Sequence, residues 1–456
     1  MTVSNEIFRA YDIRGEYGNN ITEEFAYILG KAFGSYIEKF NSNEVLVGHD
    51  NRLSSPSLSE NLIKGLLDSG ANVIDLGLVT TPMYYYARYK LNKWSAIMIT
   101  ASHNPMGDNG FKISYDARGN AAGEEILELR DFIIAGNFKE GNGNLTTYDI
   151  KDEYIDLITN SIKLGSKKIK LVMDCGNGTC SLIIKDILDK LNVTYDLLYC
   201  ESDGTFPNHH PDPAVASNLV DLQKRVVELG YDLGIAVDAD GDRVRVVDNK
   251  GNVINSDIFM VVMYRYLNKG LKTRKALFDV KCSKALLDAL DELEIEKVMY
   301  RTGNSYMFRK SKELNIDYSA EYSGHMWFGD RFEVFDDGIY AGLRMVEVLS
   351  NSDESLNELC SNVNTYYSTD ELKVKTTEEG KVIIVDKVKN YAKEKGYNYN
   401  DIDGIRIEFV DGWALIRYSN TGPNVTIRYE ANTTSRLEEI EKEFTLVINN
   451  ILKEIG

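Results

Sequence analysis

Leu233-Gly-Ile-Ala-Val237 runs directly into Asp238-Ala-Asp240-Gly-Asp242-Arg243, and the interpretation of the whole chain begins at this stretch. The apolar residues predict a short strand, and the acidic residues predict a tight turn at its end. Carboxylates at i, i+2 and i+4 can converge on one hard cation if the backbone turns, which Gly241 allows. The stretch therefore predicts a metal site at a strand end.

A plain Asp-rich turn is the alternative, because Val244-Arg-Val-Val247 can follow as the second strand of a hairpin. A calcium-binding EF-hand loop fits less well. Gly241 stands too early for the glycine of such a loop, and Asn249 stands where its bidentate Glu is required.

The chain has 456 residues, which exceeds what one hydrophobic core serves and predicts three or four domains. Its formal net charge of -18 argues against nucleic acid or an anionic membrane as a partner, since both are polyanions. The five cysteines form no C-x-x-C pair, so we expect thiols and no disulfide framework. No signal-like segment or long apolar run occurs, so we expect a soluble cytoplasmic protein.

Short apolar runs that lead into helical patterns recur along the chain, which is the rhythm of βαβ units. They are Glu44-Val-Leu-Val-Gly48, Ala96-Ile-Met-Ile99, Lys170-Leu-Val-Met173 and Ala276-Leu-Phe-Asp-Val280. The C-terminal part differs, because Ile405–Val410 and Trp413–Ile416 alternate around Asp411-Gly412, a strong hairpin signal. A helix is predicted from about Arg436 to Ile455, so this part should be α+β with an antiparallel sheet. Polar stretches suggest domains at 1–150, 151–253, 254–366 and 367–456.

A second chemically suggestive loop is Thr100-Ala-Ser102-His103-Asn-Pro105, followed by Asn109-Gly-Phe-Lys112. A hydroxyl at a strand-end turn can carry a phosphoryl group if cations surround it. A Ser/Asn turn ended by Pro105 is the alternative. An acyl-transfer serine is disfavoured because G-x-S-x-G is absent around Ser102.

Two further loops carry polar groups suited to sugar and phosphate. Glu321, Ser323 and His325 follow the predicted strand Ile316–Ala320 at alternate positions, so on an extended segment they would face one side. Arg417-Tyr-Ser419-Asn420-Thr421-Gly422-Pro423 offers a guanidinium, hydroxyls and backbone N–H groups for an oxyanion. A structural histidine and a plain polar turn are the respective alternatives.

Together these loops resemble those of the α-D-phosphohexomutase superfamily. The resemblance extends over essentially the whole chain, beginning with Phe8-Arg-Ala-Tyr-Asp-Ile-Arg-Gly15. Gly204-Thr-Phe-Pro-Asn-His-His-Pro-Asp-Pro213 and Ser419-Asn-Thr421 are similar to the phosphomannomutase/phosphoglucomutase branch. Phosphoglucosamine mutases typically carry Ser-Gly-Thr in the last loop and so fit less well.

The resemblance implies four domains around a central cleft, three α/β domains with mixed sheets and a smaller C-terminal α+β domain. In chain order they would supply the phosphoserine loop, the metal loop, the sugar loop and the phosphate loop. It implies that Ser102 is the phosphoserine and that Asp238, Asp240 and Asp242 hold Mg²⁺ with it. The other implied residues are Lys112 and Arg243 for proton movement and charge stabilisation; Glu321, Ser323 and His325 for the sugar, His325 also as an acid or base; Arg417, Ser419, Asn420 and Thr421 for the phosphate; and Tyr11, Arg14, His103 and Lys281 elsewhere in the cleft.

Two departures from the family pattern concern substrate contacts. The family often has Thr-Gly-His-Ser where this chain has Thr302-Gly-Asn304-Ser305, so His325 or Lys112 would cover any proton transfer. The family often places Arg three residues after the proline of the phosphate loop, where this chain has Thr426. Arg428 shares a strand face with that position and could still reach the phosphate.

The expected reaction is the interconversion of mannose 6-phosphate and mannose 1-phosphate, and also of the glucose pair, with a hexose 1,6-bisphosphate as intermediate and activator. The alternatives are a phosphoglucosamine mutase, a Mg²⁺-dependent sugar phosphatase and a sugar-phosphate-binding protein without activity. The expected partners are small hexose phosphates, and the protein would be a monomer or a homodimer.

Overall fold

The computed structural model describes residues 4–419 and 422–455. They form two compact units, each of which combines separate stretches of the chain. The first unit runs up to Asn255 and also includes Asn304–Tyr318 and Ser323–Ser361. The second comprises Ser256–Gly303, Ser319–Tyr322 and the chain from Asn362 onward.

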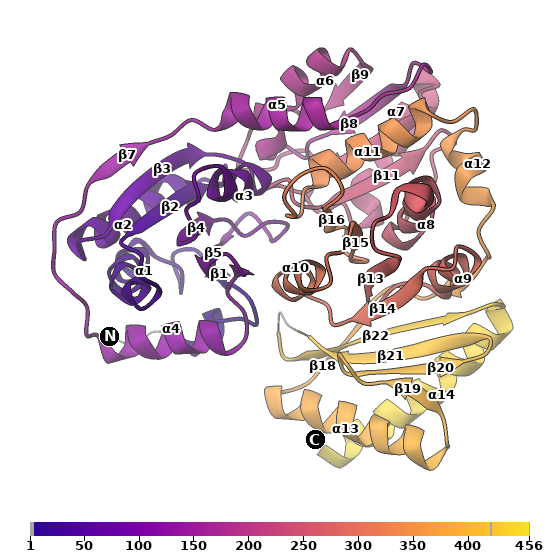
Figure 1. Ribbon diagram of the computed structural model, residues 1–456. Coiled ribbons are helices and arrows are strands. Elements are labelled where there is room, and N and C mark those ends of the chain that lie inside the picture. The colour runs from indigo at the N-terminus through magenta and orange to yellow at the C-terminus, as the bar shows by residue number, and fades with distance from the viewer. Residues whose placement is uncertain (1–3, 420–421, 456) are drawn as a thin grey trace. The chain divides into compact units, whose positions relative to one another are not determined.

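The first unit begins with a mixed sheet in the order β1-β5-β4-β2-β3-β7, with β6 paired to β5 (Figure 1). Its strands are β1 (Ile13–Glu16), β2 (Glu44–His49), β3 (Asn72–Leu78), β4 (Ala96–Ile99), β5 (Asp108–Asp116), β6 (Gly119–Asn120) and β7 (Leu145–Thr147). Its helices are α1 (Glu23–Tyr36), α2 (Ser55–Asp68), α3 (Thr81–Lys90) and α4 (Glu124–Ala135). β2 runs parallel to β3 and β4, whereas β5 is antiparallel to β1 and β4.

The parallel strands β2 and β4 place two loops side by side. β4 is buried along its whole length, and β2 is buried apart from its first and last residues. Both strands are mainly apolar, as expected of strands covered on both faces. Parallel neighbours end at the same edge of a sheet, where ligands of α/β proteins gather. The segment after His49 and the segment after Ile99 therefore meet there, and they carry Arg52 and Ser102.

A second mixed sheet of the first unit has the order β12-β11-β10-β8-β9. Its strands are β8 (Lys170–Asp174), β9 (Thr194–Leu198), β10 (Leu233–Val237), β11 (Val244–Asp248) and β12 (Val253–Ile254). The remaining elements of this unit are α5 (Lys151–Ser161), α6 (Ile184–Leu191), α7 (Val220–Leu229), α10 (Asn304–Glu313), β16 (Met326–Phe328), α11 (Gly338–Ser350) and α12 (Leu356–Ser361). The strand predicted at 233–237 is confirmed as β10. The acidic run does close the hairpin β10–β11, so the plain-turn interpretation describes the backbone correctly without excluding a site.

In the second unit, β13 (Lys275–Asp279) pairs in parallel with β14 (Glu296–Tyr300) and β15 (Tyr318–Ala320). The helices α8 (Ser256–Leu267) and α9 (Lys284–Glu292) accompany these strands. Short 3-10 helices in the two units lie at Asn5–Ile7, Ile37–Phe40, Thr179–Leu182, Ala216–Leu219 and Asn268–Gly270.

The C-terminal part of the second unit is an antiparallel sheet in the order β17-β22-β21-β20-β19, with β18 paired to β22. Its elements are β17 (Tyr367–Ser368), β18 (Leu372–Lys375), α13 (Glu378–Glu394), β19 (Asn398–Asn400), β20 (Ile405–Phe409), β21 (Gly412–Tyr418), β22 (Asn424–Ala431) and α14 (Thr434–Ile455). Side chains of α13 and α14, among them Ile384, Phe444 and Ile448, form one core with the sheet. The predicted hairpin, the C-terminal helix and the fold class, α/β with an antiparallel α+β C-terminal part, are confirmed.

Two expectations about local structure are wrong. Cys175 and Cys200 form a disulfide, with Cα atoms 5.0 Å apart, because the parallel neighbours β8 and β9 end beside each other. The segment from Tyr322 to Gly324 forms a turn and a bend and is not an extended strand. Gly324 has φ of +104° and lies against the backbone of Val244, a combination that requires glycine.

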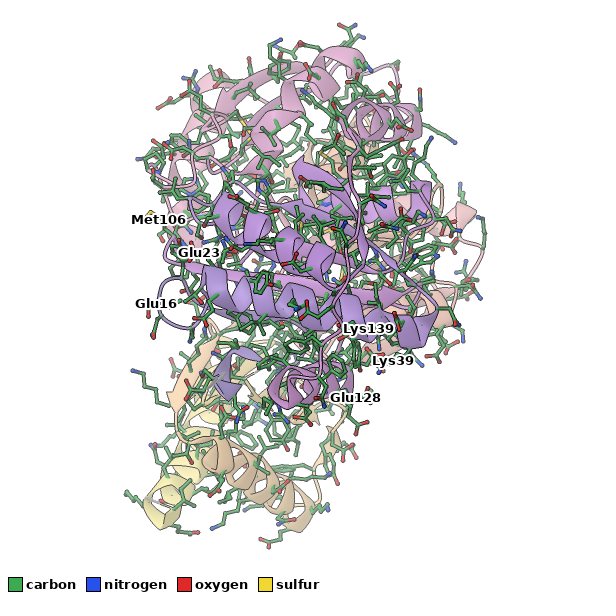
Figure 2. The ribbon with its side chains drawn as sticks, turned by 90° about the vertical axis from the view of Figure 1, so that its left-hand side faces the viewer. Glu16, Glu23, Lys39, Met106, Glu128 and Lys139 are labelled. Carbon is green, nitrogen blue, oxygen red and sulfur yellow. A yellow bond between two sulfur atoms is a disulfide. The ribbon has the colours of Figure 1, made fainter. Side chains whose placement is uncertain are left out.

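In the parts of the chain that the structure describes, we found no helix long and apolar enough to cross a membrane. The tip of the loop after β4 reaches the surface at Met106, which is half exposed (Figure 2). Ser102, four residues earlier, is buried.

Candidate active site

Ser102 lies in the loop between β4 and β5 with its hydroxyl directed at an aspartate of the acidic turn. Its Oγ donates a hydrogen bond to Oδ2 of Asp238 at 2.7 Å. The backbone of Ser102 has φ of +48°, a left-handed conformation that is uncommon for residues other than glycine and often marks a functional position. The structure therefore joins the serine and the acidic turn, which lie more than a hundred residues apart in the sequence.

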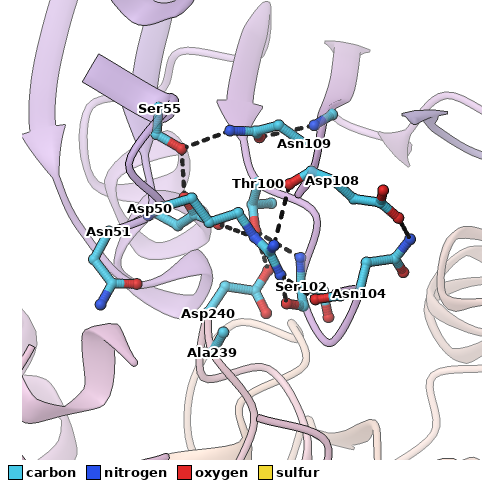
Figure 3. Close-up of polar contacts among 12 residues, drawn as sticks. Asp50, Asn51, Ser55, Thr100, Ser102, Asn104, Asp108, Asn109, Ala239 and Asp240 are labelled. Carbon is cyan, nitrogen blue, oxygen red and sulfur yellow. Dashed lines mark hydrogen bonds and ion pairs between the residues drawn. The ribbon is translucent and has the colours of Figure 1, made fainter. Parts of the chain in front are cut away.

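Arg52 holds the serine loop in place, a role that our sequence analysis missed. Its guanidinium donates to the backbone carbonyls of Ser102 at 2.6 Å, Asn104 at 2.7 Å, Pro105 at 2.7 Å and Asp108 at 3.1 Å. Figure 3 shows this arrangement, with Asp50 and Ser55 on one side and Asn104 and Asp108 on the other. The Nε atom lies 3.3 Å from Asp50, and both side chains are fully buried.

Replacing Arg52 with alanine should both destabilise the protein and lower its activity. Loss of one partner from a buried ion pair costs about 3–5 kcal/mol, and the loop carbonyls would also lose their donors. Thermal or urea unfolding measures the first effect and turnover the second. Arg118→Ala is the matched control, because Arg118 pairs with Asp116 at 2.7 Å on the surface and should contribute less than about 1 kcal/mol. Equal stability of the two variants would contradict the anchoring role.

The acidic turn brings Asp238, Asp240 and Asp242 together as predicted. Each offers an oxygen within 4.8 Å of the others, and all three are buried. The turn is closed by a hydrogen bond from Gly241 N to Asp238 O at 3.1 Å, and Gly241 has φ of +82°, as its predicted role requires. Asp240 also accepts hydrogen bonds from Thr81 at 2.8 Å and Thr100 at 3.1 Å, which fix its Oδ2 atom.

These three carboxylates fit a hard divalent cation. Burial and the negative charges of Asp242 and Asp240 raise the pKa of Asp238 well above its ordinary value. A bound cation would relieve this repulsion between the carboxylates. Oδ1 of Asp240 and Oδ1 of Asp242 are buried and have no hydrogen-bond partner in residues 4–419 and 422–455. An all-oxygen set with free lone pairs is what Mg²⁺ or Ca²⁺ binds, so the triad could hold a metal ion.

Lys112, on β5, supplies a fixed positive charge at the triad. Its Nζ lies 2.8 Å from Oδ2 of Asp240 and also contacts Asp242. Burial opposes the charge, but the two carboxylates outweigh it and raise the pKa of Lys112 well above its ordinary value. Lys112 therefore places a positive charge where it can stabilise negative charge at the triad.

His325 is held in one tautomer by its two neighbours. Nε of Arg243 lies 3.0 Å from Nε2 of His325, and an arginine N–H can only donate, so Nε2 is the acceptor. The ring proton is then on Nδ1, which lies 2.9 Å from Asp336 and 3.5 Å from Asp242. Asn304, the residue that departs from the family pattern, donates to Asp336 in turn. Nε2 of His325 thus faces Arg243, and Nδ1 faces Asp336.

The remaining predicted residues of the first unit surround the serine loop. Arg14 donates to Asn104 at 2.8 Å and pairs with Asp12 at 2.6 Å. Burial and the positive charges of Arg243 and Arg14 lower the pKa of His103 well below its ordinary value. The ring of Tyr11 lies edge-on to Tyr306, with ring centroids 6.5 Å apart.

The second unit contains a separate cluster of buried cations, formed by Lys281, Arg417 and Arg428. Nε of Arg417 lies 2.9 Å from Asp403, while its Nη2 atom is buried and lacks a hydrogen-bond partner in the described part of the chain. Arg428 donates to the carbonyl of Lys281 and stacks 3.9 Å from the ring of Tyr322. The cluster therefore offers a free guanidinium nitrogen for an anion, whereas Arg428 is engaged by the protein.

The predicted sugar-binding residues are divided between the units. Glu321 belongs to the second unit, where it accepts a hydrogen bond from the backbone N–H of Gly303 at 2.5 Å. Ser323 and His325 belong to the first. Ser419 is buried at the end of β21. Asn420 and Thr421 lie outside the described residues.

The sequence analysis did not identify Arg52 or Asp336, and it did not foresee that Asn304 donates a hydrogen bond to Asp336. Arg52 had a usable signal, because Asp50-Asn-Arg52 follows the predicted strand at 44–48 as Ser102 follows the strand at 96–99. Asp336 had none, since it stands in a short irregular segment before α11 and meets His325 only in the fold.

Comparisons with known proteins identify the family of the chain. The chain matches four consecutive domains described as phosphoglucomutase/phosphomannomutase: alpha/beta/alpha domain I over residues 5–140, domain II over 152–251, domain III over 255–366, and the C-terminal domain over 371–447. A phosphomannomutase/phosphoglucomutase of Pseudomonas putida is 38% identical over 451 residues, which is 99% of this chain and 97% of that protein. A phosphoglucomutase of Neisseria meningitidis is 36% identical, covering 98% of each.

A solved structure supports the same conclusion. The crystal structure of a phosphoglucomutase/phosphomannomutase family protein from Burkholderia thailandensis superposes with a TM-score of 0.91 at 34% identity, covering 99% of this chain and 98% of that one. Fold and matched length together define an intramolecular phosphotransferase. The chain belongs to the phosphoglucomutase/phosphomannomutase family, as the sequence resemblance predicted.

Proposed function

We propose that this chain interconverts the 6-phosphate and 1-phosphate of mannose, and also those of glucose, through phospho-Ser102 and a hexose 1,6-bisphosphate. The observation that carries the proposal is the 2.7 Å hydrogen bond from Ser102 Oγ to Asp238 in a cluster of three buried aspartates and Lys112. The names of the full-length relatives supply the two sugars. We further propose functional domains at 1–150, 151–253, 254–366 and 367–456.

In the proposed reaction the phosphoryl group leaves Oγ of Ser102 and bonds to the free hydroxyl of the hexose monophosphate. The proton of that hydroxyl must be taken up while Oγ of Ser102 gains one, and His325, whose ring contacts Arg243 and Asp336, is the candidate acid or base for this exchange. The bisphosphate then turns around, and its other phosphoryl group returns to Ser102. Mg²⁺ held by Asp238, Asp240 and Asp242 would neutralise negative charge on the phosphoryl group during its transfer.

The remaining assignments concern charge stabilisation, the sugar and the non-reacting phosphate. Arg243 and Lys112 stabilise charge near Ser102. Glu321, Ser323 and His325 bind the sugar, and Tyr11, Arg14 and His103 complete the surroundings of the loop. The phosphate that is not reacting is held by residues of the second unit: Lys281, Arg417, Ser419, Asn420, Thr421 and, less directly, Arg428.

A side-by-side assay tests the reaction and its alternatives. Mannose, glucose and glucosamine 1-phosphates are each supplied with the matching 1,6-bisphosphate, and isomer and free phosphate are both measured. We expect isomerisation of the mannose and glucose substrates. Free phosphate without isomer would identify a phosphatase, a preference for glucosamine 1-phosphate a phosphoglucosamine mutase, and no turnover of any substrate a binding protein.

Arg417→Ala should weaken the hold on the non-reacting phosphate. Charge-assisted hydrogen bonds contribute about 1.5–3 kcal/mol, so we expect KM to rise roughly 10- to 100-fold and more bisphosphate to escape per turnover. Phosphorylation of Ser102 should persist, because that step uses the other unit. Arg436→Ala is the control, since Arg436 forms exposed ion pairs in the same unit. An unchanged KM with no extra bisphosphate release would contradict the assignment of Arg417.

A further inference from the structure

Glu371 places a carboxylate among the cations that we assign to the phosphate of the substrate. Its Oε1 atom lies 2.9 Å from Nζ of Lys281. Lys281 together with Arg417 and Arg428 lowers the pKa of Glu371 to about 2, so the carboxylate is ionised at any working pH. The residue stands immediately before β18, where the C-terminal domain match begins.

Glu371 is attached differently from the other two acids of the cluster. Asp279 is fixed by hydrogen bonds from the backbone N–H of Tyr322 and the hydroxyl of Thr302, both at 3.0 Å. Asp403 accepts from the backbone N–H of Thr302 at 3.0 Å and from Arg417. In residues 4–419 and 422–455, Glu371 pairs with Lys281 alone, and its side chain is 31% exposed while that of Lys281 is 8% exposed.

The cations of the cluster already face carboxyl groups without a substrate. Lys281 faces Glu371 and Asp279, Arg417 faces Asp403, Asp279 and Glu371, and Arg428 faces Asp257, Glu430 and Glu371. A phosphate group that enters needs cationic partners that are not already paired. In the described residues the Nη2 atom of Arg417 has no hydrogen-bond partner, whereas Nζ of Lys281 lies 2.9 Å from Glu371 and 3.9 Å from Asp279. Departure of Glu371 would therefore free most of the charge of Lys281. The side chain of Glu371 is partly exposed, so its carboxylate can turn toward solvent when a phosphate engages Lys281.

We propose that Glu371 is a resident counter-ion that the non-reacting phosphate displaces from Lys281. The inference rests on the proposed function and adds to it a residue that sets phosphate affinity. Competition from Glu371 raises the apparent Kd for phosphate in inverse proportion to the fraction of time that Lys281 is unpaired. The bisphosphate must dissociate from this cluster in order to reorient. Competition from Glu371 lowers the affinity of the cluster for its phosphate and so favours that dissociation.

The test is direct binding of two probes, inorganic phosphate and glucose 1-phosphate, to the dephosphorylated full-length protein by calorimetric titration. If Lys281 is paired most of the time, Glu371→Gln should lower the Kd of both probes roughly 3- to 30-fold. The KM for glucose 1-phosphate should fall in step while kcat does not rise. A purely structural role would instead raise KM. Glu454→Gln is the control, because Glu454 forms an ion pair with Lys387 on the surface of the same unit.

Glu371→Ala serves as a second variant, since it also removes the charge and the side chain is partly in solvent. If both Glu371 variants bind the probes as the wild type does, or more weakly, while Arg417→Ala weakens binding, the counter-ion role is wrong and the phosphate site stands. If Arg417→Ala leaves binding unchanged as well, the assignment of the phosphate site has failed and the inference falls with it.

Discussion

Replacing Ser102 with alanine should remove the phosphoenzyme and nearly all turnover. The Oγ atom of Ser102 donates to Asp238, whereas the neighbouring hydroxyls of Thr81 and Thr100 donate to Asp240 and are not expected to replace it. Loss of a group that forms the covalent intermediate lowers kcat by on the order of 10⁴-fold or more. Intact-protein mass spectrometry should find one phosphoryl adduct on the wild-type protein after incubation with a hexose 1,6-bisphosphate, and none on the variant.

The conformation of Ser102 suggests a second variant for the same experiment. Its φ of +48° strains any side chain with a Cβ atom, so Ser102→Gly should be at least as stable as Ser102→Ala while losing the same activity. Ser361→Ala, at the exposed end of α12, controls for loss of a serine hydroxyl. Substantial turnover by both Ser102 variants would overturn the assignment, whatever their stability.

Local sequence patterns predicted the elements that carry the site. The hairpin around Asp411-Gly412 and the strand before Asp238 are specified by residues close together in the chain, and both are confirmed. The glycine of the acidic turn was also predictable, because a short turn between two paired strands needs a positive φ.

What could not be predicted depends on residues distant in the sequence. Arg52 meets the loop of Ser102 because β2 and β4 pair in parallel, and no local pattern states which strands become neighbours. The disulfide between Cys175 and Cys200 has the same origin, since it depends on the pairing of β8 with β9.

The error at Glu321–His325 has a steric cause. Alternate polar residues indicate one face only if the segment is extended, and Gly324 instead turns the chain at φ of +104°. The turn is needed because Val244 N donates to the carbonyl of Gly324 at 3.1 Å, which brings His325 beside Arg243. His325 thus lies beside Arg243 because of a turn that the period of the polar residues does not predict.

Removal of divalent metal should stop turnover, and Mg²⁺ should restore it. The three buried aspartates carry more negative charge than Lys112 and Arg243 balance once a phosphoryl group is added, so a cation is required for that group to approach. A bound metal contributes several kcal/mol of charge stabilisation, so treatment with a chelator should lower kcat on the order of 10³-fold. Activity that survives complete chelation would contradict the metal site.

Stability provides a readout of the same site that does not depend on catalysis. A ligand that binds only the folded protein stabilises it by about 2.7 kcal/mol at a concentration a hundred times its Kd, so Mg²⁺ should raise the Tm of the wild-type protein. Asp242→Asn removes one oxygen anion and should abolish most of that increase together with turnover. Asp203→Asn changes an aspartate in an exposed turn and should leave both unchanged.

Asp242 also forms an ion pair with Lys112, so the Tm of Asp242→Asn without Mg²⁺ reports the loss of that ion pair alone. Only the difference between the Tm values with and without Mg²⁺ measures metal binding. An equal rise in Tm for Asp242→Asn and the wild type would show that Mg²⁺ binds elsewhere.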